Sequence, residues 1–119
     1  MVLVATREVS LTRKFSQWVD PRASVQRVTT LGTLLRQVED AGNARIVIVV
    51  DCASPSIRAK SLAAVVEELS PWVQVVLWGA SVAVEREIAV VSPLTSDWLI
   101  IGAETTAKDL ALRCAALVG

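Results

Sequence analysis

Short apolar runs alternate with amphipathic stretches along the whole chain. The apolar runs cover residues 2–5, 25–29, 44–51, 73–78 and 98–101. The third and fourth runs are continuous rather than alternating with polar residues, which is typical of strands covered by helices on both faces of a sheet. The pattern therefore predicts five β-strands at these positions.

The segments between these runs carry apolar residues at the three- and four-residue spacing of a helix. In chain order, the inward-facing positions are Leu11, Phe15, Trp18 and Val19; Leu31, Leu34, Leu35 and Val38; Ile57, Leu62, Val65, Val66 and Leu69; Val84, Ile88 and Val91; and Leu110, Cys114 and Leu117. The third helix is expected to begin at Ser54-Pro55, a cap followed by a first-turn proline, and to end at Pro71. The last helix is expected to begin at Thr105 or Thr106.

Strict alternation of strands and helices with short connections predicts a parallel sheet that is wound on both faces by right-handed crossovers. A chain of 119 residues is long enough for one domain and too short for two. We find no internal repeat, linker or low-complexity tract. The expectation is a single α/β domain over residues 1–119, either a complete small protein or a domain of a longer regulatory one.

Composition narrows the classes of function. Twelve basic and twelve acidic side chains cancel, which argues against a nucleic-acid surface and gives little electrostatic repulsion against self-association. The chain has no histidine, and the spacing of its two cysteines suggests neither a metal site nor a disulfide. It lacks a signal peptide and an apolar run long enough to cross a bilayer. We expect a cytoplasmic protein that uses no cofactor, no metal and no membrane contact.

Asp51 is the most informative single residue. It ends the longest apolar run and is followed by Cys52-Ala53-Ser54 and then Pro55. A carboxylate at this position stands at the carboxyl edge of a buried strand, where open α/β sheets place their ligands and their chemistry. Asp51 is therefore the first candidate site residue.

Five βα units, with Asp51 at the end of the third strand and Pro55 four residues on, resemble the receiver domain of two-component response regulators. Trp98 stands where receivers carry an aromatic switch residue, three positions before a lysine. The resemblance covers the whole chain. It implies a flavodoxin-like sheet of order 2-1-3-4-5, a phosphoacceptor aspartate, and signalling through the last two helices and the last strand of a bacterial regulatory protein.

The positions that would support phosphorylation depart from the receiver pattern. Receivers end strand one with two acids that hold Mg²⁺, whereas this chain has Thr6 and Arg7, with Glu8 just beyond. Gly79 stands in place of the hydroxyl residue of strand four, and Ile101 in place of the lysine after strand five. Because Mg²⁺ needs carboxylate oxygens and phosphoryl transfer needs the metal, the chain resembles a pseudo-receiver that has lost phosphotransfer. A receiver still phosphorylated on its aspartate is the alternative.

Arg7 suggests a specific arrangement of this degenerate pocket. Its guanidinium could pair with Asp51 and stand in permanently for the metal, because the fork matches a carboxylate and does not deprotonate. The alternative is that Arg7 points into solvent and Asp51 caps the region of the third helix. The sequence does not decide between these two hypotheses.

The resemblance also implies a partner surface on helix four, strand five and helix five, for a second copy of the chain or for another protein. We expect it to be centred on Trp98, because tryptophan is enriched at interface hot spots. The candidate rim charges are Glu85, Glu87, Lys108 and Arg113. Of the other tryptophans, Trp18 and Trp78 are expected in the core, and Trp72 is expected to be half exposed.

An enzyme is the least favoured hypothesis. Cys52 and Arg58 form a Cys-x₅-Arg string between a strand and a helix, as in tyrosine-phosphatase-like enzymes and arsenate reductases, and Asp20-Pro21 resembles the acid-bearing dipeptide of the low-molecular-weight class. However, Pro55 removes an amide from the phosphate cradle, the loop has no glycine, and that class places its cysteine after strand one. We therefore expect a protein that is not an enzyme.

Overall fold

The computed structural model describes residues 1–19, 23–69 and 72–118, without the side chain of Val66. The strands are β1 (Val2–Ala5), β2 (Val25–Val28), β3 (Ile46–Asp51), β4 (Val73–Trp78) and β5 (Leu99–Ile101). The α-helices are α1 (Val9–Trp18), α2 (Leu31–Asp40), α3 (Ala59–Ala64), α4 (Val82–Val91) and α5 (Ala107–Val118), with 3₁₀ turns η1 (Val66–Glu68) and η2 (Pro93–Asp97). The predicted alternation of strands and helices is confirmed.

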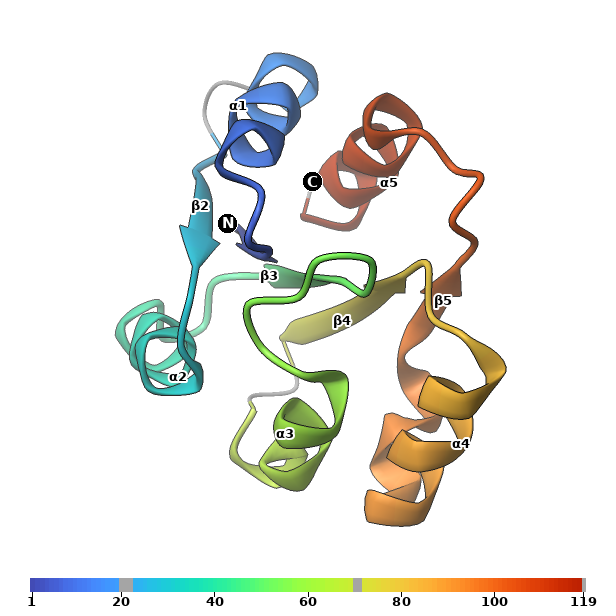
Figure 1. Cartoon of the computed structure of the whole chain (residues 1–119). Coiled ribbons are helices and arrows are strands. Elements are labelled where there is room, and N and C mark those ends of the chain that lie inside the picture. The colour runs from blue at the N-terminus through green and yellow to red at the C-terminus, as the bar shows by residue number, and fades with distance from the viewer. Residues whose placement is uncertain (20–22, 70–71, 119) are drawn as a thin grey trace.

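All five strands run parallel in the order β2-β1-β3-β4-β5 (Figure 1). This is a flavodoxin-like fold, and it is consistent with a receiver-like architecture. The predicted sheet order is therefore confirmed. Strands β2 and β5 are the two edges of the sheet, and β1 and β3 lie inside it.

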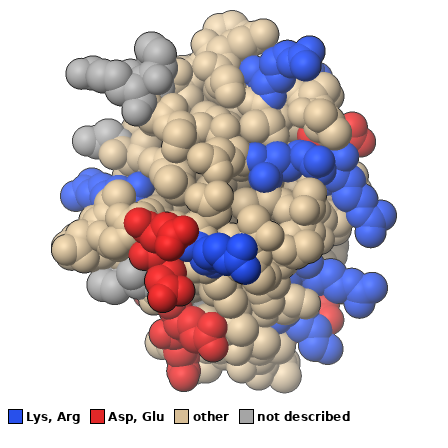
Figure 2. Space-filling model, turned by 90° about the vertical axis from the view of Figure 1, so that its left-hand side faces the viewer, with Lys and Arg blue, Asp and Glu red and all other residues tan. Residues whose placement is uncertain are grey.

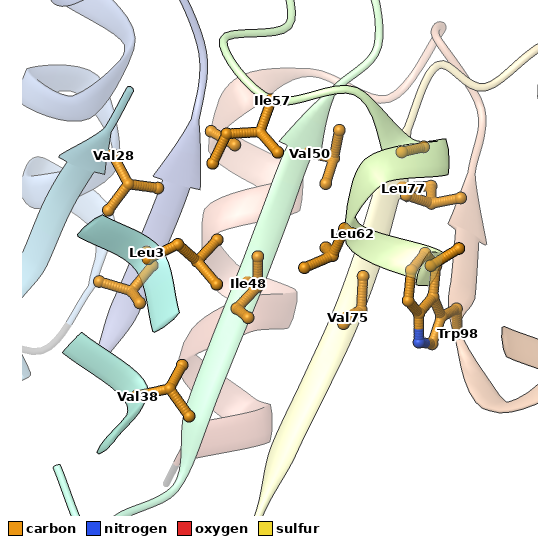
Figure 3. Packing of buried hydrophobic residues seen from close by; sticks show 14 of the residues in the cluster. Leu3, Val28, Val38, Ile48, Val50, Ile57, Leu62, Val75, Leu77 and Trp98 are labelled. Atoms are coloured by element: carbon orange, nitrogen blue, oxygen red, sulfur yellow. The ribbon is translucent and has the colours of Figure 1, made fainter. Parts of the chain in front are cut away.

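Two hydrophobic layers cover the two faces of the sheet. Helices α1 and α5 pack on one face, through Phe15 and Leu110 among others, whereas α2, α3 and α4 pack on the other. Every residue of β1 and β3 is buried, as expected for continuous apolar strands between two helical layers. Figure 3 shows the second layer, in which Leu3, Ile48 and Val75 from three neighbouring strands face Leu62 of α3 and the ring of Trp98.

Hydroxyl side chains cap three of the helices. Thr30 accepts a hydrogen bond from the amide of Thr33, and Ser81 accepts one from the amide of Val84. Thr106 accepts one from the amide of Asp109 at 3.2 Å, so the predicted start of the last helix is confirmed. Each cap satisfies one of the amides that a helix leaves free at its first turn.

The predicted start of the third helix is wrong. Helix α3 begins at Ala59, after Arg58 in extended backbone conformation, and not at Ser54-Pro55. The preceding loop is instead anchored to β2, because the Ser56 hydroxyl donates a 2.6 Å hydrogen bond to the carbonyl of Val28. Ile57 is buried as expected, but from this loop. The predicted end of this helix is also wrong, because α3 ends at Ala64, before Pro71, which itself lies outside the described residues. The inward position expected for the Val66 side chain lies outside the description as well.

The tryptophans differ in their surroundings. Trp18 was expected in the core but is 40% exposed at the end of α1, so this prediction is wrong. Trp78 packs against the α1/α5 layer, and its Nε1 donates a hydrogen bond to the carbonyl of Thr105 at 3.0 Å. Trp72 is 49% exposed, as predicted. Among the described residues, no helix is long and apolar enough to cross a membrane.

Candidate functional site

The carboxylate of Asp51 is buried and fully engaged. It is 5% exposed at the end of β3. Its Oδ2 accepts a hydrogen bond from the Thr6 hydroxyl at 2.9 Å, and its Oδ1 accepts one from the amide of Ala53 at 3.2 Å. The Thr6 oxygen in turn accepts a hydrogen bond from the amide of Glu8 at 3.0 Å. Neutral donors on two loops therefore satisfy both carboxylate oxygens, as a buried charge requires.

The loops after β1 and β3 are joined by further hydrogen bonds. The amide of Arg7 donates to the carbonyl of Ser54 at 2.8 Å. The Arg27 guanidinium, from β2, donates through Nη1 to the carbonyl of Thr6 at 3.2 Å. These contacts hold three adjacent strand ends in one arrangement, so the surroundings of Asp51 are built by backbone groups as well as by side chains.

The hypothesis that Arg7 pairs with Asp51 is wrong. Arg7 is exposed, and no ion pair connects these two residues, both of which the structure describes. The Thr6 hydroxyl, which is completely buried, is the donor at Oδ2 instead. The alternative hypothesis placed Arg7 in solvent, which is correct, and made Asp51 a cap of the third helix region, which is wrong. The Oδ1 of Asp51 instead accepts a hydrogen bond from an amide two residues along the loop, as in an Asx turn.

Basic side chains dominate the exposed surface around this buried carboxylate. Arg7 lies in the loop after β1, Arg27 is the third residue of β2, and Arg58 ends the loop between β3 and α3; all three are exposed. In Figure 1 the loops after β1 and β3 face the viewer. In Figure 2, where the molecule is turned by 90°, this side lies at the right-hand margin, and Lys and Arg side chains gather there. Among the described residues, no group of three His, Cys, Asp or Glu side chains could hold a metal ion. The edge where receivers hold Mg²⁺ is therefore basic in this chain.

Gly79 and Ile101, the other two departures from the receiver pattern, have structural roles. Gly79 has a φ of +76°, a conformation that favours glycine, and its amide donates to the carbonyl of Ile101 at 2.7 Å. A Cβ at this position would lie 3.5 Å from the Cβ of Ala103. The side chain of Ile101 is 6% exposed and belongs to the α1/α5 layer. Neither residue brings a polar side chain to Asp51.

The surroundings of Cys52 favour the protonated thiol, because burial and the nearby Asp51 raise its pKa. It is partly buried, and its Sγ donates a long 3.7 Å hydrogen bond to the carbonyl of Val50. Burial, together with the negative charge of Asp51, raises the pKa of the Cys52 thiol to about 11. Phosphatase-like catalysis needs a thiolate near neutral pH, so this microenvironment opposes the Cys-x₅-Arg hypothesis. Its proposed acid, Asp20-Pro21, lies outside the described residues.

The alkylation of Cys52 by iodoacetamide tests this interpretation. With Cys114 replaced by alanine, the rate should be about a hundredfold below that of an unhindered thiol near neutral pH, because a pKa two units higher leaves that much less thiolate. Since the neutral thiol is the favoured form, the rate should keep rising until about pH 11 instead of levelling off near the ordinary value of 9.0. The same chain unfolded in urea provides the control and should react with an ordinary pKa. Fast alkylation of the folded chain at neutral pH would restore the enzyme hypothesis.

A second feature is a groove of about 560 Å³ between α4, η2 and β5. Ile88, Thr95 and Trp98 line it, and Glu85 and Ile100 also contribute to its walls. Trp98 is only 8% exposed and packs with the core of the α2/α3/α4 layer. Trp98 reaches the surface only as a wall of this groove, so the expectation that a partner surface is centred on it stays a prediction.

The four predicted rim charges are not brought together. Glu85 lies at the groove, whereas Glu87 pairs with Lys60 of α3 at 3.6 Å. Lys108 lies 4.5 Å above the ring of Trp18, on the side of α5 that faces α1. Arg113 is exposed and five residues further along α5, which places it about 140° around the helix from Lys108. Only Glu85 is placed at the groove.

Sequence reasoning missed the apolar edge beside this groove. Leu99 and Ile100 of β5 are 41% and 42% exposed, and Leu94 of η2 is 50% exposed. Strand β5 is an edge of the sheet and pairs on one side with β4 alone, so these side chains lie next to unpaired backbone groups. The signal that could have found them is the sheet order, which makes the last apolar run an edge strand.

Comparisons with known proteins give no relative. No protein-family model, no curated protein and no solved structure matches this chain. The function must therefore be argued from the residues and their geometry.

Proposed function

We propose that this chain is a pseudo-receiver that acts by protein–protein interaction or dimerisation, without Mg²⁺-dependent phosphotransfer and without enzymatic activity. The sheet order and the position of Asp51 support the receiver part of the proposal. The observation that carries the rest is the state of the Asp51 carboxylate, both of whose oxygens accept hydrogen bonds from Thr6 and Ala53. A phosphoacceptor needs a metal held by further carboxylates beside it, whereas the groups that contact Asp51 here are a neutral hydroxyl and an amide.

The surface around β5 supports the interaction part of the proposal. It combines a groove with the exposed apolar side chains of Leu94, Leu99 and Ile100, next to the free edge of a strand. Exposed apolar residues that cluster beside a groove are typical of protein-binding surfaces, and a free strand edge offers main-chain hydrogen bonds to a partner. The partner would be a second copy of this chain or another regulatory protein.

The phosphotransfer question is tested by adding Mg²⁺ with beryllium fluoride, a mimic of an acyl phosphate, and recording the backbone amide NMR spectrum. We expect the spectrum to remain unchanged at millimolar Mg²⁺, because the described residues include no group of three His, Cys, Asp or Glu side chains that could hold the metal beside the buried carboxylate. Shifts that begin at Asp51 and spread to Trp98 would instead identify an atypical receiver that is still phosphorylated. An Asp51→Asn variant is the control, since it should remove any shift that depends on the carboxylate.

The interaction surface is tested by placing a charge on it. Ile100→Lys should weaken self-association, or binding to an isolated partner, by at least about tenfold, because a charge would have to be buried in an apolar contact. The matched control is Val9→Lys, which changes an exposed apolar residue on α1, far from β5. Sedimentation velocity over a range of concentrations measures the change. If both variants associate as the unmodified chain does, the β5 surface is not the interface.

A further inference from the structure

A separate cavity of about 340 Å³ opens between α3 and α4, beneath the loop that follows β3. Its apolar walls come from Val50 at the end of β3, Ala59 of α3 and Val84 of α4. Cys52 and Arg58 of the loop also line it. Neither Thr6 nor Asp51 belongs to the residues that line it, so the cavity is distinct from the hydrogen-bonded pocket of Asp51.

The charges around this cavity leave one cation without a partner. Lys60 and Glu87 also line the cavity, and they neutralise each other through their 3.6 Å ion pair. Within the described part of the chain, Arg58 is exposed and has neither an ion pair nor a side-chain hydrogen bond. The carboxylate of Asp51, at the start of this loop, is buried, and its oxygens accept hydrogen bonds from other donors. The cavity therefore carries one uncompensated positive charge.

We propose that this cavity binds a small monocarboxylic acid with an apolar body. The carboxylate lies on the guanidinium of Arg58, and the apolar body packs against Val50, Ala59 and Val84. The volume falls within the range of small-molecule sites, which are mostly apolar with a few polar groups that fix orientation. A single guanidinium fork matches one carboxylate in both shape and charge.

The backbone of the loop favours a carboxylate over a phosphate. A phosphate site needs several amide donors that converge on the anion. Pro55 has no N–H, and residues 52–58 contain no glycine that would let the backbone curl around an anion. The amide of Ala53 is already donated to Asp51, and the amide of Ser54 to the carbonyl of the same residue. A phosphate dianion would therefore find the amides of Ala53 and Ser54 already engaged.

A pair of probes that differ only in charge tests the proposal. We would titrate 4-phenylbutyrate and its uncharged amide, 4-phenylbutyramide, into the protein and follow the backbone amides by NMR. The carboxylate should give saturable shifts in α3, in α4 and in the loop after β3, with a dissociation constant of about 1 mM. The amide should bind at least about tenfold more weakly, because it cannot form the charged pair.

Arg58→Gln should weaken binding of the carboxylate by at least about tenfold and leave binding of the amide unchanged. Arg58 is exposed, so this change should preserve the fold, and Arg36→Gln on the exposed face of α2 is the matched control. The proposal is overturned if 4-phenylbutyrate does not bind by about 20 mM, if the amide binds equally well, or if Arg58→Gln has no effect.

Cys52 provides an independent measurement, because this residue lines the cavity whereas Cys114 is buried in α5. Saturating 4-phenylbutyrate should slow the alkylation of Cys52 by at least about fivefold in alkaline buffer, since the probe covers the thiol. An unchanged alkylation rate at saturation would place the probe elsewhere and overturn the assignment. Because this site does not involve β5, its failure would leave the proposed interaction surface untouched.

Discussion

Replacing Trp98 by alanine should destabilise the fold by about 3–4 kcal/mol. The indole is 8% exposed and belongs to the core layer under α2, α3 and α4, beside Leu77 and Val75 (Figure 3). Truncation removes a large buried side chain and leaves a cavity that its neighbours fill only in part, which typically costs about 3–5 kcal/mol for tryptophan. We place the expected value toward the lower end because one side of the ring borders the groove, where water can enter.

Urea unfolding followed by far-ultraviolet circular dichroism measures this loss, since tryptophan fluorescence would itself change with the substitution. Trp72→Ala is the matched control, because its side chain is 49% exposed and should cost no more than about 1 kcal/mol. Trp98→Phe should keep most of the stability. A loss below about 1 kcal/mol for Trp98→Ala would mean that the ring is not a core element and is available to a partner.

Replacing Thr6 by valine should destabilise the fold by about 2 kcal/mol. Valine has nearly the same shape as threonine, so the change removes one hydroxyl and little packing. Asp51 loses its donor at Oδ2, and the amide of Glu8 loses its acceptor. A hydrogen bond to a charged group contributes about 1.5–3 kcal/mol, and a buried carboxylate without that donor bears a desolvation cost.

Thr6→Ser distinguishes the hydroxyl from the methyl group. It should lose much less than Thr6→Val, because the serine oxygen can make both hydrogen bonds. A double-mutant cycle that combines Thr6→Val with Asp51→Ala should give a coupling energy of about 1–2 kcal/mol. If the two losses simply add, the hydrogen bond between these residues does not stabilise the protein, and the account of the engaged carboxylate would have to be abandoned.

Much of the fold could be predicted because the chain marks its elements strongly. The run 46–50 is apolar at every position, and only a strand covered on both faces needs that pattern. The cap at Thr106 and the inward position of Leu110 follow from local rules that the surrounding structure does not oppose. The order of the strands did not follow from these local rules and required the resemblance to receivers.

The remaining differences arise from tertiary contacts that local patterns do not encode. Ser54-Pro55 has the form of a helix start, but the anchor from Ser56 to β2 keeps that loop extended until Arg58. Trp18 has the right spacing for the core, yet it lies in the last turn of α1 with its side chain 40% exposed and its ring beneath Lys108 of α5.

The sequence did not identify Thr6 as the donor to Asp51, because the opposite charge of Arg7 made that residue the expected partner. Burial decides this contact instead. Thr6 is completely buried and reaches the carboxylate with a small neutral hydroxyl, whereas a guanidinium could remain hydrated in solvent. At a site where every donor must leave water, a short neutral side chain was the better candidate.

The position of β1 inside the sheet has a consequence for synthesis of the chain. Val2 of β1 pairs with Val25 of β2 on one side and with Val47 of β3 on the other. This strand, buried at all four positions in the finished fold, is synthesised before either of its two partners. Pairing over such separations slows folding and prolongs the exposure of apolar surface. The apolar side chains of β1 therefore lack one of their two neighbouring strands until β3 has also been synthesised.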